Sequence, residues 1–322
     1  MLVMLSLLPL VMLLMLTTLL ASDAVTASEY KYSSSMKRPR EVRWWVAANR
    51  IEENVSFLDS HAQAATGVYT YLGIGVMPSG ELSVSHSAQE LHNLTAPYLV
   101  RGYTVMPAIG FDVRAVLGGV DMRKAADIAA TLANSLGWDG LMIDYEPTQN
   151  YTAAHVNAYA AAAKVFADAM HSRGMRLGMC ISSWGINDAH EVPQGLRVYA
   201  DTGADILMSM APTYYAKGDL SKAKNFVETT LAQGVSHSQL AVGIGSVLTP
   251  NCPTGQAKWD YNWTSASLSE FVGFLDQPAH TPAAIDVWRA DIDSEGNCTE
   301  SYYFDILAHW LRGASSRSSY VG

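Results

Sequence analysis

Short apolar runs alternate with helical patterns along this chain from residue 41 onward. Such alternation is typical of successive strand–helix units built around a parallel sheet. The apolar runs predict strands at 42–47, 67–76, 104–109, 140–145, 176–182, 206–210, 240–244 and 284–288.

The helical patterns follow these strands one by one. They predict helices at 52–64, 88–99, 122–135, 153–173, near 193–199, and at 221–233, 265–275 and 302–311. The longest of these patterns, which ends at residue 173, is the clearest. It is rich in alanine, Thr152 is suited to cap its start, and Gly174 ends it.

Eight strand–helix units are the number that closes a barrel, and residues 41–314 have a normal length for one. An open, doubly wound sheet is the main alternative. The first predicted strand is not followed by the glycine-rich turn of a nucleotide-binding sheet. We therefore predict an α/β fold, a single (β/α)8 TIM barrel, with a flexible C-terminal tail at 315–322.

The first 27 residues predict a secretory signal peptide. Leu2 to Leu20 are almost wholly apolar, and the small residues that follow end in a Val-x-Ala site at Ala27. An uncleaved membrane anchor is the alternative, because the stretch is nearly long enough to span a bilayer. A polar linker at 28–40 separates this leader from the barrel, and no later stretch could cross a membrane.

Five glycosylation sequons agree with passage through the secretory pathway. They lie at Asn54, Asn93, Asn150, Asn262 and Asn297. We therefore expect the protein to be secreted or to reach a lysosome-like compartment.

Composition excludes several classes of partner. A net charge of −9 and a pI near 5.4 argue against nucleic acid or an anionic membrane. Three cysteines are too few for a disulfide-built miniprotein, and no pair has zinc-site spacing. Cys252 and Cys298 could bridge in an oxidising compartment, whereas Cys180 sits in a strand-like run and predicts a buried thiol. We expect a monomer that uses no cofactor and no metal.

The strongest chemical signal is the run Trp138-Asp-Gly-Leu-Met-Ile-Asp-Tyr-Glu146, an apolar strand that ends on two acids. Side chains alternate along a strand, so Asp144 and Glu146 point the same way, together with Met142. Carboxyls at the C-terminal end of a barrel strand lie where such barrels build active sites. A structural ion pair is the alternative, but unpaired buried acids are costly. The opposite face of the strand carries Leu141, Ile143 and Tyr145.

The same run resembles the signature Asp-Gly-x-Asp-x-Asp-x-Glu of glycoside hydrolase family 18, the chitinase-like family. Asp139, Gly140, Asp144 and Glu146 match it, while Met142 stands where the family has its first acid. The resemblance extends over nearly the whole chain after the linker. It includes the segments 68–82, 105–110, 240–245 and 284–293, which are similar to the family's second, third, seventh and eighth strands.

This resemblance implies two details of the barrel. The third strand of the family often reads Ser-x-Gly-Gly. In this chain, Pro107 or Ala108 occupies the position of that serine. The interval 246–265 is too short for the small α+β domain that many members insert after the seventh strand. The cleft should therefore be shallow on that side.

The resemblance also assigns roles. Glu146 would act as general acid and then as general base, and Asp144 would hold the N–H of the substrate's acetamido group. The acetamido carbonyl, rather than a second side chain, would be the nucleophile, an exception to the two-carboxylate scheme. Trp288 would form an apolar platform under the sugar, with Tyr214 and Met210 beside the acetamido group. Alternatively, Trp288 is an ordinary core residue and Tyr214 lies at the rim with its hydroxyl facing water. Asp139 is expected to fix the entrance of its strand.

The leading hypothesis is a retaining glycosidase that cleaves β-linked N-acetylglucosamine, in chitin oligosaccharides or the core of N-glycans. Met142 cannot share a proton with Asp144, so we expect Asp144 to keep one orientation and turnover to be slower. One alternative is a catalytically weak or inactive chitinase-like lectin. Another is a glycosidase with a carboxylate nucleophile about 5 Å from Glu146. The candidates for that second acid are Asp112, Asp188 and Asp291.

Overall fold

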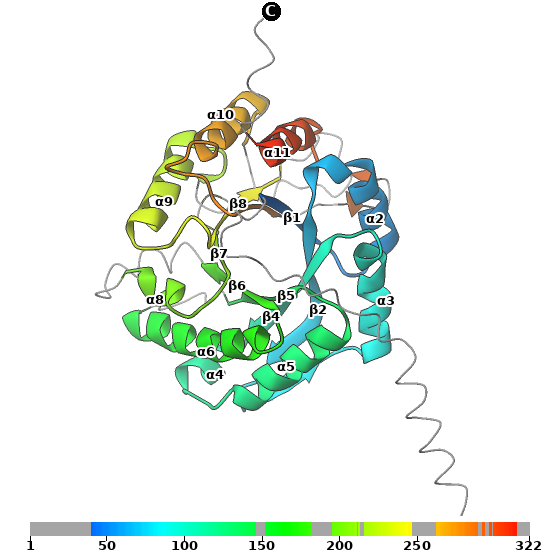
Figure 1. Cartoon of the computed structure of the whole chain (residues 1–322), viewed down its shortest axis with the longest axis vertical. Helices are drawn as coiled ribbons and strands as arrows, with labels where there is room; N and C mark the ends of the chain where they lie inside the picture. Colours follow the sequence, from blue (N-terminus) through cyan, green and yellow to red (C-terminus); the bar gives the residue numbers. More distant parts are fainter. Residues whose placement is uncertain are drawn as a thin grey trace, which may run out of the picture. The chain divides into compact units, whose positions relative to one another are not determined.

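The computed structural model describes residues 40–145, 152–181, 195–210, 212, 216–246, 262–288, 292–293, 296–297 and 299–313. Within these ranges, eight parallel strands close into a barrel (Figure 1). In order around the barrel they are β1 (Glu41–Val46), β2 (Gly67–Val76), β4 (Thr104–Phe111), β5 (Gly140–Asp144), β6 (Arg176–Ile181), β7 (Ile206–Ser209), β8 (Leu240–Gly245) and β9 (Ala284–Trp288).

The sheet closes into a barrel because β1 is hydrogen-bonded to β2 on one side and to β9 on the other. An open sheet would leave two edge strands, so the doubly wound alternative is excluded and the predicted TIM barrel is confirmed. One antiparallel strand, β3 (Leu82–Val84), pairs with the end of β2 and forms a hairpin with it.

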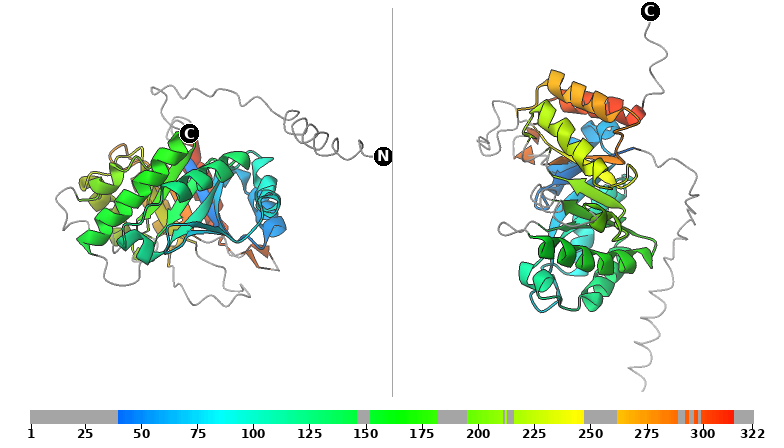
Figure 2. Two further views of the ribbon diagram at one scale, coloured as in Figure 1. Left: turned by 90° about the horizontal axis from the view of Figure 1, so that it is seen from below. Right: turned by 90° about the vertical axis from the view of Figure 1, so that its left-hand side faces the viewer.

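Helices form a layer outside the strands, as the views along and across the barrel both show (Figures 1 and 2). None of the described helices is long and apolar enough to cross a bilayer. They are α2 (Ile51–Ser60), α3 (Ala88–Leu99), α4 (Val113–Leu117), α5 (Arg123–Ser135), α6 (Ala153–His171), α8 (Arg197–Ala200), α9 (Leu220–Ala232), α10 (Ser265–Leu275) and α11 (Tyr302–Arg312).

The predicted boundaries agree with these elements closely, and the differences have local causes. Strands β2 and β9 and helices α3 and α10 have the predicted ends. The helix predicted at 52–64 stops earlier, at Ser60, and continues as a separate 3₁₀ turn at Ala62–Ala64. Helix α4 was not predicted, because its five residues are too few to show a helical period.

Helix α6 begins where its sequence predicts and ends at His171, two residues before the predicted end. The backbone N–H of Thr152 donates a hydrogen bond to Nδ1 of His155, 3.2 Å away. His155 is 8 % exposed and therefore has a structural role at the helix start. After the helix, Gly174 takes a left-handed conformation with φ of 71°, which turns the chain into β6.

A buried network of charged groups lies in the lower part of the barrel interior, on the side of the N-terminal ends of the strands. Arg43, 1 % exposed, pairs with Glu41 and lies 3.5 Å from Oδ1 of Asp286, which is fully buried. The Arg43 guanidinium also donates to the Tyr69 hydroxyl at 2.9 Å, and that hydroxyl donates to Asp286 at 3.2 Å. Arg176 donates to Glu41 from β6 at 2.7 Å. These contacts connect β1 with β2, β6 and β9 through the centre of the barrel.

The two acids of this network respond differently to it. Burial pushes the pKa of Glu41 upward, but the charges of Arg43 and Arg176 outweigh burial and leave it lowered. Burial raises the pKa of Asp286 to about 6, although Arg43 and Tyr69 act in the opposite direction.

The remaining predictions about chain organisation concern residues outside the described ranges. These include the leader at 1–27, most of the linker, the tail at 315–322, and both Cys252 and Cys298. Cys180 is described and is fully buried inside the barrel, as predicted.

We predict that Arg43→Met lowers the free energy of unfolding by about 3–5 kcal/mol, because it leaves the fully buried Asp286 without a positive partner. Urea denaturation at pH 7 measures this loss. The control is Arg114→Met, since Arg114 pairs with Asp112 on the surface and is 74 % exposed. Equal effects of the two substitutions would show that the buried network does not support the barrel.

Asp286 should also make stability depend on pH. Its folded-state pKa of about 6 lies above the ordinary value of 3.8, so its contribution is full below pH 3.8 and is lost as pH rises through 6. Asp286→Asn cannot titrate. Between pH 4 and pH 7 the difference in unfolding free energy should therefore shift by about 2–2.5 kcal/mol in favour of the variant. If urea denaturation gave the same pH dependence of the unfolding free energy for the wild type and for Asp286→Asn, this expectation would be contradicted.

Candidate functional site

The candidate site lies at the end of the barrel where the parallel strands finish. Asp144 is the last residue of β5, Trp288 is the last residue of β9, and Met210 directly follows β7. The structure therefore brings these three sequence-predicted residues to the same end of the barrel. Glu146 and Tyr214, the other two, lie outside the described residues.

The face assignment of β5 is confirmed for its described residues. Met142 belongs to the apolar cluster inside the barrel, while Leu141, Ile143 and Tyr145 pack in the outer core between strands and helices. Asp144 follows Met142 by two positions and shares its inward face.

One described side chain donates a hydrogen bond to Asp144. The hydroxyl of Tyr71, from β2, lies 2.7 Å from its Oδ2 atom. The other carboxylate oxygen, Oδ1, is buried and has no hydrogen-bond partner among the described residues. A buried carboxylate oxygen without a donor is costly, so this atom is suited to accept an N–H from a bound molecule.

Aromatic rings surround this carboxylate. The ring of Trp45 lies 5.2 Å from that of Tyr71 and 5.2 Å from that of Trp288, and Tyr71 and Trp288 meet edge to face at 6.3 Å. Trp45 is 3 % exposed, whereas Tyr71 is 43 % exposed. The three rings form an aromatic wall with an exposed edge, the kind of surface that receives the apolar face of a ring-shaped ligand.

Sequence reasoning missed Trp45 and Tyr71. The usable signal was their position on the inward face of a barrel strand. Trp45 lies next to the end of β1, and Tyr71 follows the inward residue Tyr69 of β2 by two positions. Trp288 was found only through the family resemblance. It is half-buried at the end of β9 and packs against the inner apolar cluster.

Apolar groups fill the space below Asp144. Met142 is fully buried and stands in register with Ala108 on β4 and Gly178 on β6. A Cβ atom at position 178 would lie 2.6 Å from Cε of Met142, so the glycine makes room for the thioether. Met210, 3 % exposed, belongs to the same inner cluster. Met142, at the position of the family's first acid, and the neighbouring Ala108 have no polar group that could contact Asp144.

Asp139 lies at the opposite end of β5, as expected for a residue that fixes the strand entrance. Its Oδ2 atom accepts a hydrogen bond from the backbone N–H of Val105 at 2.8 Å. Burial raises the pKa of this carboxyl, and the Val105 N–H offsets part of the effect.

Asp112, one of the three candidates for a second catalytic acid, already has partners. It caps helix α4 by accepting from the backbone N–H of Arg114 at 2.8 Å, and it pairs with the Arg114 side chain at 2.9 Å. The Arg114 side-chain hydrogen bond, followed by that of its backbone N–H, lowers the pKa of Asp112. Asp188 and Asp291 lie outside the described residues. Within the described part of the chain, no cluster of three His, Cys, Asp or Glu side chains could hold a metal ion.

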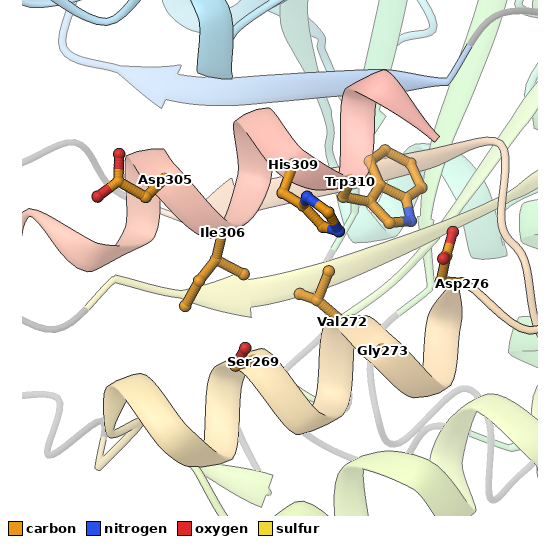
Figure 3. A pocket seen from close by; sticks show the side chains of 8 residues that line it. All are labelled: Ser269, Val272, Gly273, Asp276, Asp305, Ile306, His309 and Trp310. Carbon is orange, nitrogen blue, oxygen red and sulfur yellow. The ribbon is translucent and has the colours of Figure 1, made fainter. Parts of the chain in front are cut away.

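A separate pocket of about 330 Å³ lies in the helix layer, between α10 and α11 (Figure 3). Asp276, in its lining, forms an ion pair with Arg40, and Arg40 also donates to the backbone carbonyl of Trp310 at 2.8 Å. This pocket contains none of the predicted site residues. It is lined by Ser269, Val272, Gly273, Asp276, Asp305, Ile306, His309 and Trp310.

Comparison with known proteins identifies relatives by structure alone. No family model and no curated protein sequence matches the chain. Among solved structures, a chitinase from Chromobacterium violaceum matches with a TM-score of 0.61 at 11 % identity, covering 84 % of this chain and 99 % of the other.

Two further structures show how widely the fold is used. A GH18 chitinase from Flavobacterium johnsoniae matches with a TM-score of 0.56 at 14 % identity, over 85 % of this chain and 94 % of the other. A GH113 β-1,4-mannanase matches with a TM-score of 0.53 at 10 % identity, over 86 % of this chain and 99 % of the other. The resemblance to family 18 is thereby confirmed at the level of the fold, which is a glycoside hydrolase-like TIM barrel.

Proposed function

We propose that the protein is a divergent member of glycoside hydrolase family 18. In this proposal it is a retaining glycosidase that cleaves β-linked N-acetylglucosamine, in chitin oligosaccharides or in the core of N-glycans. The observation that carries the proposal is Asp144. It ends β5 inside the barrel mouth, with one oxygen held by Tyr71 and the other buried without a donor among the described residues.

The reaction begins with the sugar's acetamido group. Oδ1 of Asp144 accepts the acetamido N–H, which turns the acetamido carbonyl oxygen toward the anomeric carbon. That oxygen attacks the carbon while Glu146 protonates the leaving glycosidic oxygen, and an oxazolinium forms. Glu146 then takes a proton from water as the water attacks the anomeric carbon from the opposite face. The two displacements together retain the configuration.

The aromatic wall supports sugar binding in this mechanism. Trp288, at the end of β9, would place its ring under the apolar face of the sugar. Trp45 packs edge to face against the ring of Trp288, at a ring separation of 5.2 Å. Met210 would line the floor of the pocket, and Tyr214 would approach the acetamido group.

Two alternatives have specific observations in their favour. The loss of the family's first acid to Met142 favours a glycan-binding lectin without activity, whereas the presence of Glu146 favours an enzyme. The structural likeness to a mannanase favours a glycosidase with a different substrate and a carboxylate nucleophile. Asp112 is a poor candidate for that nucleophile, because Arg114 and the start of α4 already occupy its carboxylate.

We further propose that the protein enters the secretory pathway. The apolar leader at 1–27 and the sequons at Asn93, Asn150, Asn262 and Asn297 support this route. The sequon at Asn54 does not, because Asn54 is fully buried and its Nδ2 donates a hydrogen bond to the carbonyl of Ala47 at 2.6 Å. A substrate such as chitin or an N-glycan would be met there or outside the cell.

The central test is hydrolysis of fluorogenic chitobioside and chitotrioside by the mature protein and its Glu146→Gln variant. We expect the variant to lose about 10²–10⁴-fold in turnover, because it cannot exchange a proton. Glu53→Gln is the control, since Glu53 is exposed on the outer helix α2. Undiminished turnover in Glu146→Gln would remove Glu146 from the mechanism. Saturable sugar binding without turnover in any form would identify a lectin.

Met142→Asp restores the missing first acid and tests its effect. We expect turnover to rise, because the new carboxyl can share a proton with Asp144. The free energy of unfolding should fall by about 1–3 kcal/mol, since a polar group replaces a fully buried thioether. Met142→Leu should leave turnover unchanged and cost less than about 1.5 kcal/mol. Unchanged or lower turnover in Met142→Asp would contradict this account of the departure from the family.

A further inference from the structure

The end of strand β2 contains an irregularity that lies directly after Tyr71. Tyr71 is in register with Ala108 of β4, but the next paired residues are Ile74 and Ile109. Leu72 and Gly73 are therefore extra residues that have no counterpart on β4. Bulges of this kind are common next to active sites, where they redirect a side chain.

The bulge is held in place by the hairpin that follows it. The carbonyl of Gly73 accepts hydrogen bonds from both the backbone N–H and the hydroxyl of Ser85, at 3.0 and 3.1 Å. Gly73 has φ of 64°, and a Cβ atom there would lie 2.6 Å from the Ser85 hydroxyl. Only glycine fits this position without strain, so the sequence fixes the conformation of the bulge.

Tyr71 reaches Asp144 across the intervening strand β4. The residue of β4 in register with Tyr71 is Ala108, and Ala108 is in register with Met142. The methyl side chain of Ala108 leaves room for the phenol to extend from β2 to the end of β5. There its hydroxyl donates to Oδ2 of Asp144 at 2.7 Å.

No other described side chain donates to this carboxylate. Met142 and Ala108, the inward neighbours on β5 and β4, have no hydrogen-bonding group to offer. The ring of Tyr71 is in turn fixed by Trp45, 5.2 Å away, and by Trp288, 6.3 Å away. A donor on a held ring constrains the rotation of the carboxyl it binds.

We propose that Tyr71 is a positioning residue, which holds Asp144 in its working orientation in place of the carboxyl partner that Met142 cannot supply. This inference rests on the function proposed above. By binding Oδ2, Tyr71 leaves Oδ1 for the acetamido N–H of the substrate. The small side chain of Ala108 on the intervening strand leaves room for the contact, and the glycine bulge follows Tyr71 directly.

The first experiment measures kcat and KM on fluorogenic chitobioside for Tyr71→Phe, which removes only the hydroxyl. We expect kcat to fall about ten- to a hundredfold with KM nearly unchanged, because the lost bond orients a charged group rather than binding the sugar. The matched control is Tyr103→Phe. The Tyr103 hydroxyl donates to the carbonyl of Leu58 at 3.0 Å, away from the barrel mouth, so kcat should not change.

Rescue separates positioning from a general structural role. Met142→Asp, introduced into Tyr71→Phe, should restore part of the lost kcat, whereas Met142→Leu in the same background should restore none. A Tyr71→Phe enzyme as active as the wild type, or one that Met142→Asp does not improve, would overturn the proposal.

A second measurement tests the pair without relying on catalysis. In thermal unfolding, Tyr71→Phe should lower the midpoint in the wild-type background and have no effect in the Asp144→Ala background. Wild-type protein without turnover would remove the proposed glycosidase function. The unfolding midpoints would then test the Tyr71–Asp144 pair by themselves. An equal effect of Tyr71→Phe on the midpoint in the wild-type and Asp144→Ala backgrounds would overturn the pair.

Discussion

The buried guanidinium of Arg43 is the interaction on which the interior of this barrel depends. It carries a positive charge in a space that water does not reach, and it stays there because Glu41, Asp286 and Tyr69 surround it. Removing any ion from water is costly, so each of these groups is tolerable only in the presence of the others. Because the partners come from β1, β2 and β9, the network joins the strands at which the barrel closes.

This arrangement divides the barrel into two levels. In the lower level, the charges of Arg43, Glu41 and Asp286 are paired with one another inside the barrel. In the upper level, the same strands continue with Trp45, Tyr71 and Trp288, whose rings pack together but leave part of Tyr71 exposed. The strands that carry the closed network thus also carry the aromatic wall, two residues further along.

Asp144 differs from the acids of the lower level in how it is held. Glu41 has two arginines beside it, whereas Asp144 has a single neutral donor among the described residues. A neutral hydroxyl fixes the direction of a carboxylate without cancelling its charge. That is the condition under which an acid can orient a polar group of a substrate and still influence a neighbouring general acid.

Local sequence determined the elements and their faces. Alternation along β5 assigned Met142 and Asp144 to the inside and Leu141 and Ile143 to the outside, and the helix signals at Thr152 and Gly174 marked the ends of α6. These features depend on residues a few positions apart, which the chain specifies by itself. The signature around Asp144 likewise lies within a single strand.

Only the tertiary structure decided which groups meet inside the barrel. Tyr71 and Asp144 are 73 positions apart, and Tyr69 and Asp286 are 217 apart. Both contacts follow from the strand register around the closed barrel. Register is set by the packing and pairing of all the strands together, and an alternation pattern in one strand contains no information about its neighbour's offset. The sequence therefore placed Asp144 in the barrel mouth, and the fold alone supplied its partner.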